Sequence, residues 1–127
     1  MQNEFVDFLL SRKRISPSGA ERLARWLRHT PQPVGMIAMS HGLLTGHAID
    51  EILHRQSETG ELFGEIAVKM AHLTQAQVDH LLDVQRFRRY TTAVEGLALS
   101  GRLQIEEATA LFSDFLRTET VTGGLPA

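Results

Sequence analysis

The sequence has 127 residues, of which 43% are apolar and 22% are charged, and these values are typical of a single soluble domain. It contains no cysteine, which excludes disulfide scaffolds, thiol nucleophiles and cysteine-based zinc sites. The formal charge of -2 gives no overall attraction to nucleic acid or to anionic lipid. Because no apolar run approaches the roughly 18 residues that a membrane span needs, we expect a cytoplasmic protein without membrane insertion.

Four segments of similar pattern follow one another along the chain. They start at positions 6, 35, 64 and 94, so that consecutive starts lie 29, 29 and 30 positions apart. In each segment, a short apolar stretch is followed by a tight turn and then by a longer stretch with apolar residues at offsets of three and four, the spacing of one helical face. The pattern predicts helix-turn-helix hairpins over about 5–29, 33–57, 62–88 and 92–117.

The predicted turns carry residues that suit the ends of helices. Ser16, Thr45 and Thr74 precede a second helix, where a side-chain oxygen can accept a hydrogen bond from an unpaired amide of the first turn. Gly42 and Gly101 suit the left-handed residue that often ends the preceding helix. In the two central hairpins, the inward stripe of the second helix is predicted to contain Ile49, Ile52, Leu53, Val78, Leu81 and Leu82. No segment alternates apolar and polar residues, so no β-strand is expected.

The connections between the hairpins differ in composition. Two prolines within 29–33 prevent a continuous helix there, and 57–60 ends in glycine. Residues 85–92 contain neither glycine nor proline, so either a bent or a continuous helix from about 75 to 100 fits the sequence. The predicted fold class is all-α, with four tandem helix-turn-helix hairpins of about 29 residues packed as one compact helical domain over 1–118. A flexible tail is expected over 119–127.

The two inner hairpins differ from the two outer ones at two aligned positions. The inner hairpins have Gly35 and Gly64 near their starts and Gln56 and Gln85 at their ends, whereas the outer ones have large apolar residues there. A helical projection places both glutamines on the inward face. Because an unmatched buried amide costs roughly 1–3 kcal/mol, we expect each glutamine to bind either the backbone of the next linker or a ligand. The glycines allow close helix packing or close approach of a ligand.

Residues 33–85 resemble the tandem motif of the MshEN domain. Each copy has a glycine near its start, aliphatic residues along both helices and a glutamine at its end, from Gly35 to Gln56 and from Gly64 to Gln85. The family motif spans 24 positions and occurs twice with a spacer of five, which matches the interval of 29 positions in this chain. MshEN domains are the N-terminal modules of type II secretion and type IV pilus assembly ATPases, and members often bind cyclic-di-GMP. The resemblance implies a related helical fold.

The resemblance also implies a set of candidate ligand-binding residues. They are Gly35, Gly42, Gln56, Gly64 and Gln85, with Arg55 as a neighbouring substitute for a motif arginine. In the family, each motif opens with Arg-Leu-Gly, and the arginine contacts the guanine or the phosphate of the dinucleotide. This chain has Pro33 and Leu62 at the arginine positions, and it has Ala71 at the second glycine of the second copy. Losing two charge-assisted contacts of roughly 1.5–3 kcal/mol each predicts much weaker dinucleotide binding.

Two further groups of side chains have alternative interpretations. The set His47, Asp50, Glu51 and His54 has offsets that fit a metal-binding edge or an exposed polar face, and its projection opposite the apolar stripe favours the exposed face, so no metal site is expected. Arginines beside aromatic residues in 22–28 and 86–90 fit either DNA binding or an acidic partner surface. The net acidic charge favours the second, and nucleic acid is not the expected partner.

The sequence contains no glycine-rich phosphate loop and no nucleophile elbow, so we expect no enzyme activity. The leading hypothesis is a non-enzymatic bacterial regulatory or adaptor module that resembles the cyclic-di-GMP-binding domain of secretion and pilus ATPases. It would act through contacts with another bacterial protein, such as a secretion, pilus or signalling component, and would require no cofactor. The alternative is a functional cyclic-di-GMP sensor, and a DNA-binding helical module is a further alternative.

Overall fold

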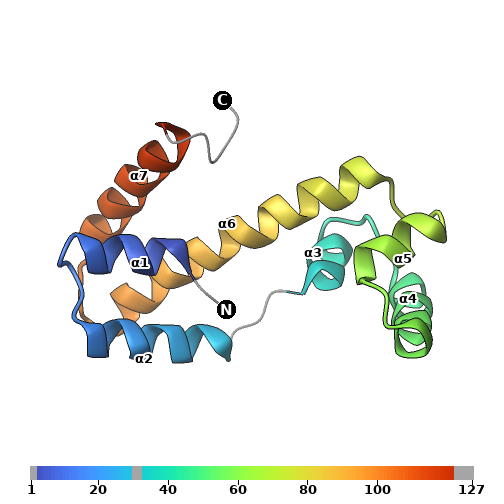
Figure 1. The fold of residues 1–127 in the computed structure, drawn as a ribbon, viewed down its shortest axis with the longest axis horizontal. Coiled ribbons are helices and arrows are strands. Elements are labelled where there is room, and N and C mark those ends of the chain that lie inside the picture. Colours follow the sequence, from blue (N-terminus) through green and yellow to red (C-terminus); the bar gives the residue numbers. More distant parts are fainter. Residues whose placement is uncertain (1–2, 30–32, 122–127) are drawn as a thin grey trace. The chain divides into compact units, whose positions relative to one another are not determined.

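The computed structural model describes residues 3–29 and 33–121 of the chain. Within these ranges the chain is all-helical, with seven helices and no strand, which confirms the predicted all-α class (Figure 1). The helices are α1 (Glu4–Ser11), α2 (Pro17–Arg28), α3 (Val34–Ser40), α4 (Gly46–Thr59), α5 (Phe63–Lys69), α6 (Gln75–Leu99) and α7 (Ile105–Val121).

Capping side chains explain where several helices begin. The hydroxyl oxygens of Ser16, Thr45 and Thr74 each accept a hydrogen bond from the backbone amide three residues further on, at 3.0, 3.1 and 3.1 Å. These bonds confirm the three caps predicted from the sequence, and each satisfies an amide that the helix itself leaves unpaired. Helix α2 also begins on Pro17, whose missing amide hydrogen is not needed at that position. Helix α1 has a cap that the repeat pattern did not identify, the side chain of Asn3.

The turns before α2, α4, α6 and α7 share one backbone geometry. In the described part of the chain, each turn has a residue with positive φ at the aligned position: Lys13 at 56°, Gly42 at 72°, Ala71 at 60° and Gly101 at 75°. The amide of the next residue donates to the carbonyl five residues before it, at 2.9, 2.9, 2.9 and 3.2 Å. This combination is the Schellman motif, which satisfies carbonyls at a helix end. It confirms the left-handed conformation predicted for the two glycines.

Helix α6 runs without interruption from Gln75 to Leu99, so the segment 85–92 is helical throughout. Gly96 lies inside this helix, and a Cβ atom there would come within 2.7 Å of the Trp26 ring, which indicates close packing of α6 on α2. None of the described helices is long and apolar enough to cross a membrane.

The chain divides into two compact units. Unit 1 comprises the described parts of 1–31 and 88–127, and unit 2 comprises those of 32–87, so that α6 contributes residues to each unit. The repeat pattern predicts a single domain over 1–118 and does not contain this division, because periodicity identifies the inward face of a helix but not the helix that it meets. Helix α7 continues to Val121, past the expected start of the tail. The rest of that predicted tail, 122–127, lies outside the described residues.

The core of unit 1 is built around aromatic side chains. Phe5, Tyr90, Phe112 and Phe115 are all buried. The Phe5 ring centroid lies 5.3 Å from that of Phe112 and 5.4 Å from that of Phe115. The Tyr90 hydroxyl donates a hydrogen bond to the Glu4 carboxylate at 3.1 Å, so the polar end of the ring has a partner. Helix α1 packs against both α2 and α7, which brings the two ends of the chain into one core.

The core of unit 2 is aliphatic and contains several small residues. Its buried members are Ile37, Ala38, Leu44, Ala48, Ile52, Ile66, Ala67, Leu73, Val78 and Leu81. Helix α5 contacts both α3 and α4, and the alanines at these crossings let the helices approach closely. Within the described residues of this unit no aromatic side chain is buried, and Phe63 packs at the edge of the core.

Candidate binding site

An open groove with a volume of about 780 Å³ lies within unit 2. Its walls come from α3, α4, α5, the first part of α6 and the segment that joins α4 to α5. The lining residues are Pro33, Val34, Gly35, Met36, Ile49, Leu53, Gln56, Leu62, Phe63, Gly64, Glu65, Gln75, Val78, Leu82 and Gln85. A concave site of this volume is large enough to hold a small molecule or part of a protein partner.

The residues that line the groove are related by the repeat interval of the sequence. Among the described lining residues, seven pairs are separated by 29 positions: Pro33 and Leu62, Val34 and Phe63, Gly35 and Gly64, Met36 and Glu65, Ile49 and Val78, Leu53 and Leu82, and Gln56 and Gln85. Two copies of one local pattern therefore present the same positions to a shared surface. The groove also brings together Gly35, Gln56, Gly64 and Gln85, four of the six candidate residues.

The two groove glycines lie where helices pack closely. A Cβ atom on Gly35 would come within 2.9 Å of the Phe63 ring, and one on Gly64 would come within 2.8 Å of a Val78 methyl group. Side-chain contacts this short do not occur without a shift of the neighbour. Of the two reasons for glycine that the sequence left open, the structure shows close packing at both positions, and both residues also line the groove.

The two glutamines occupy aligned positions on the groove wall, and both are half-buried. The Gln56 side-chain nitrogen donates a hydrogen bond to the backbone carbonyl of Glu61 at 3.1 Å. Of the two partners expected for this amide, the structure therefore shows the linker backbone. Through this bond, Gln56 fixes the segment between α4 and α5, which includes the lining residue Leu62.

The remaining two candidate residues do not line the groove. Gly42 lies in the turn between α3 and α4, where its φ of 72° explains the glycine without any ligand. Arg55 is exposed on α4 and is adjacent in sequence to Gln56. Neither residue therefore shares the surface on which the other four meet.

Several apolar groove residues are far more exposed than core residues. Leu53 and Leu82 each retain 48% of their exposure, although the sequence stripe predicts both to face inward. Met36 and Leu62 are 53% and 67% exposed. Leu53 and Leu82 lie at the edge of their stripes, because the neighbouring positions Ile52 and Leu81 occupy the core. The equal spacing of the two leucines within their copies is the sequence signal that identifies them as one surface.

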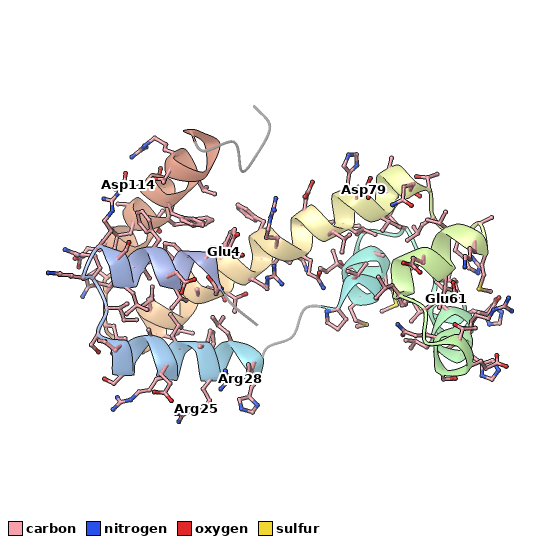
Figure 2. The ribbon with its side chains drawn as sticks, in the orientation of Figure 1. Glu4, Arg25, Arg28, Glu61, Asp79 and Asp114 are labelled. Atoms are coloured by element: carbon pink, nitrogen blue, oxygen red, sulfur yellow. The ribbon has the colours of Figure 1, made fainter. Side chains whose placement is uncertain are left out.

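The groove carries little charge of its own. Among the described lining residues, Glu65 is the one with a formal charge, and it is exposed in the first turn of α5. Close to the lining, Lys69 forms an ion pair with Glu61, which Figure 2 labels on the segment between α4 and α5. The hydrogen bond from Lys69 is the main cause that lowers the pKa of Glu61 below its ordinary value, and the positive charge of Arg55 adds to the effect.

The histidines of α4 lie beside acidic side chains four positions further along the helix. His47 lies 2.9 Å from Glu51, and His54 lies 3.3 Å from Glu58. Glu51 also lies 3.7 Å from His72, which belongs to the turn before α6. Across residues 3–29 and 33–118, no three histidine or acidic side chains are arranged so that they could hold a metal ion.

Comparison with family models, with curated proteins and with solved structures finds no match to this chain. The interpretation of the groove therefore depends on its own residues. Its described lining offers apolar contact area, the amide groups of three glutamines and a single carboxylate. That lining offers no hydroxyl, imidazole or thiol group, so the chemistry it suits best is recognition of an apolar surface.

Proposed function

We propose that this chain is a non-enzymatic regulatory or adaptor module of the bacterial cytoplasm, which binds another protein through the groove of unit 2. The composition of the groove carries the proposal. Two sequence copies contribute aligned apolar residues, several of them about half exposed, and the described lining contains one charge, which is negative. Exposed apolar area of this kind marks interaction sites on proteins. The resemblance to MshEN domains favours a secretion, pilus or signalling component as the partner.

We further propose that the chain consists of four copies of one helix-turn-helix unit. Its support is the recurrence of one turn geometry at Lys13, Gly42, Ala71 and Gly101, which are 29, 29 and 30 positions apart. The inner two copies would descend from a cyclic-dinucleotide-binding pair of motifs. In this interpretation, the helical frame of the ancestor is kept while the polar contacts of its ligand site are lost.

The described lining of the groove lacks the cations that a dinucleotide with two phosphates needs. Pro33 and Leu62, at the positions of the two motif arginines, both line the groove and immediately precede α3 and α5. Their backbone angles are nearly equal, with φ and ψ of -60° and 140° at Pro33 and of -70° and 146° at Leu62. An arginine at either position would lie at the groove, whereas proline and leucine supply no charge and no donors.

One observation favours the alternative, a cyclic-di-GMP sensor. Gly35, Gln56, Gly64 and Gln85 come from two separate motif copies and line the same groove. A retained sensor would use this cluster together with arginines from outside the motif. Arg55 is the nearest in sequence, and it lies outside the groove lining.

Titration calorimetry with cyclic-di-GMP separates the two functions. For the natural chain we expect no heat and no thermal shift at high micromolar ligand. The variant Pro33→Arg with Leu62→Arg should gain binding, because it places two charges at the groove. The control variant Met39→Arg with Leu43→Arg adds the same charge at exposed positions outside the lining and should not bind.

Two results would contradict these proposals. Low-micromolar binding by the natural chain that is abolished by Gln56→Ala with Gln85→Ala would establish the sensor in place of the adaptor. If the arginine variant gains no more than its control, the proposed descent of the groove from a dinucleotide site is wrong.

A further inference from the structure

Unit 2, which contains the groove, carries an excess of acidic side chains. Within residues 32–87 there are seven acidic residues and three of lysine and arginine, which leaves a formal charge of -4. The acidic residues are Asp50, Glu51, Glu58, Glu61, Glu65, Asp79 and Asp83, and the basic ones are Arg55, Lys69 and Arg86. The excess distinguishes this unit from the whole chain, whose formal charge is only -2.

Two of these carboxylates lie at the groove or beside it. Glu65 belongs to the lining. Asp79 directly follows the lining residue Val78 and is exposed. Figure 2 labels Asp79 on α6, where its carboxylate accepts a hydrogen bond from the lining residue Gln75. The acidic border of the groove therefore consists of Glu65 and Asp79.

The basic residues of unit 2 are associated with other acidic residues. Arg86 lies 3.5 Å from Asp83, and Lys69 forms an ion pair with Glu61. The charge of Arg55 also acts on Glu61. Glu65 and Asp79 are therefore the carboxylates of the acidic border that lie outside these ion pairs.

This distribution of charge selects among possible occupants. A second copy of unit 2 would carry the same excess of four negative charges, and a dinucleotide would bring two phosphates, so both would be repelled. A positively charged partner would be attracted. Its contact face must still be apolar, because Met36, Leu53, Leu62 and Leu82 expose about half or more of their area.

The shape of the surface selects the form of the partner. An extended peptide binds by adding a strand to a sheet edge, and the described residues contain no strand. A polyproline segment needs a groove lined with aromatic rings, and Phe63 is the one aromatic side chain in the described lining. An amphipathic helix needs an apolar groove between helices, which is the arrangement found here.

We propose that the groove binds an amphipathic helix of a partner protein, with an apolar stripe against Leu53 and Leu82 and with lysine or arginine residues flanking that stripe opposite Glu65 and Asp79. This inference rests on the proposed adaptor function and adds the chemistry of the partner. The aligned leucines give the groove two similar apolar contact points, so a helix with apolar residues at offsets of three, four and seven can meet both.

A displayed peptide library tests which flanking residues the groove prefers, without knowledge of the natural partner. Each peptide keeps leucine at helical offsets of three, four and seven, and its flanking positions are randomised equally among lysine, glutamate and glutamine. Selection on the full chain should enrich lysine at the flanks. A second library with the same composition but with the leucine stripe scrambled should give no binders that compete for the groove.

Paired variants show whether the selected peptides occupy the groove. Leu53→Glu with Leu82→Glu should weaken binding at least about 10-fold, because charge replaces the apolar contact. The control Met39→Glu with Leu43→Glu places the same groups at exposed apolar positions outside the lining and should leave the affinity unchanged. Circular dichroism checks that both variants remain helical.

Charge reversal tests the acidic border separately. Glu65→Lys with Asp79→Lys should weaken the binding of lysine-flanked peptides by about 10-fold at low salt. The difference in affinity should shrink at about 1 M salt, where the screening length is about 3 Å. Glu95→Lys with Glu106→Lys makes the same change in net charge on exposed positions of unit 1 and should have little effect.

The outcomes distinguish the inference from the function on which it rests. In one outcome, the selection enriches glutamate or glutamine at the flanks of peptides whose binding the leucine variant still weakens. That result would show that the partner is not basic, and it would leave the proposed adaptor function in place. Equal binding of the scrambled library would overturn the helical form of the partner. If the leucine variant binds every selected peptide as tightly as the natural chain does, or if no peptide is selected, both the inference and the proposed groove function are wrong.

Discussion

Units 1 and 2 use the same turn geometry, but they carry residues of different size and polarity at aligned positions. Gly35 and Gly64, which lie near the starts of α3 and α5 in unit 2, align with Val6 and Val94 in unit 1. The positions of the two glutamines correspond to those of Leu27 and Phe115. In unit 1, Val6, Val94 and Phe115 are buried at 5%, 8% and 3% exposure, whereas the unit 2 residues line an open groove.

The difference shows how one helical frame can serve either as a closed core or as a binding surface. Three of the four large apolar side chains at these positions are buried in unit 1, and each of the three contributes about 1.5–3 kcal/mol to the stability of the fold. Glycine and glutamine at the aligned positions of unit 2 do not supply this stability, and apolar residues beside them in the groove stay exposed. We therefore expect unit 2 to be the less stable unit when its groove is empty and to gain stability when a partner binds.

The largest effect is expected from truncating the aromatic core of unit 1. Phe115→Ala removes a buried ring that packs against Phe5 and Tyr90, and it should lower the free energy of unfolding by about 3–5 kcal/mol. Urea unfolding followed by the fluorescence of Trp26, the single tryptophan of the chain, measures this change in unit 1.

The matched variant in unit 2 is Leu82→Ala on the groove wall. Because Leu82 is 48% exposed, its truncation should lower the free energy of unfolding of unit 2 by less than about 1.5 kcal/mol. Hydrogen exchange of the α6 amides measures this change. Similar losses at the two sites would contradict the distinction between a filled core and an open groove.

An effect smaller than that of Phe115→Ala is expected when unit 2 receives a unit 1 residue. Gly64→Val introduces the side chain found at the aligned position 94, but its Cβ atom would lie only 2.8 Å from Val78. The crowding should destabilise unit 2 by about 1–3 kcal/mol, measured by hydrogen exchange of amides in α5. Combining Gly64→Ala with Val78→Ala should cost less than the sum of the single changes. Additive losses would show that these two residues do not pack together as described.

Much of the local structure could be predicted from the sequence because it depends on neighbouring residues. The caps at Ser16, Thr45 and Thr74 and the left-handed Gly42 and Gly101 follow from chemistry within one turn of helix. The candidate set came from the resemblance to the MshEN motif, and the structure brings four of its six residues to one groove.

The parts that the sequence did not predict depend on contacts between distant segments. The stripe on α4 predicts that Leu53 faces inward, but Ile52 fills the core, and Leu53 is left at the groove. The division into two units depends on which helices meet, and the periodicity of each helix is the same whichever partner it has. Arg55 was included because it is near Gln56 in sequence, although the two project to different sides of α4.

Turn substitutions test the feature that the two units share. Ala71→Gly in unit 2 and Lys13→Gly in unit 1 should each stabilise the protein by about 1 kcal/mol, because φ values of 60° and 56° are disfavoured for residues with a Cβ atom. Gly42→Ala should destabilise by a similar amount. Thermal unfolding measures all three, and a destabilising Ala71→Gly would contradict the common turn geometry.

The smallest effect concerns the linker of unit 2. The hydrogen bond from Lys69 lowers the pKa of Glu61, so this group stabilises the fold above the ordinary glutamate pKa, and the contribution is lost as the pH falls through the lowered value. In an NMR titration, Glu61 should titrate below its ordinary range, and Lys69→Met should move its pKa upward. An unchanged pKa in that variant would show that Lys69 is not the cause.

The order of the units along the chain has a consequence for how the protein folds during synthesis. Unit 2 is one continuous segment, whereas unit 1 joins two parts of the chain that the whole segment from 32 to 87 separates. The ribosome releases all of unit 2 before α7, so the apolar residues of α1 stay without Phe112 and Phe115 until α7 has been synthesised. Early folding of unit 2 shortens the loop that unit 1 must close, and it thereby lowers the entropy cost of that final step.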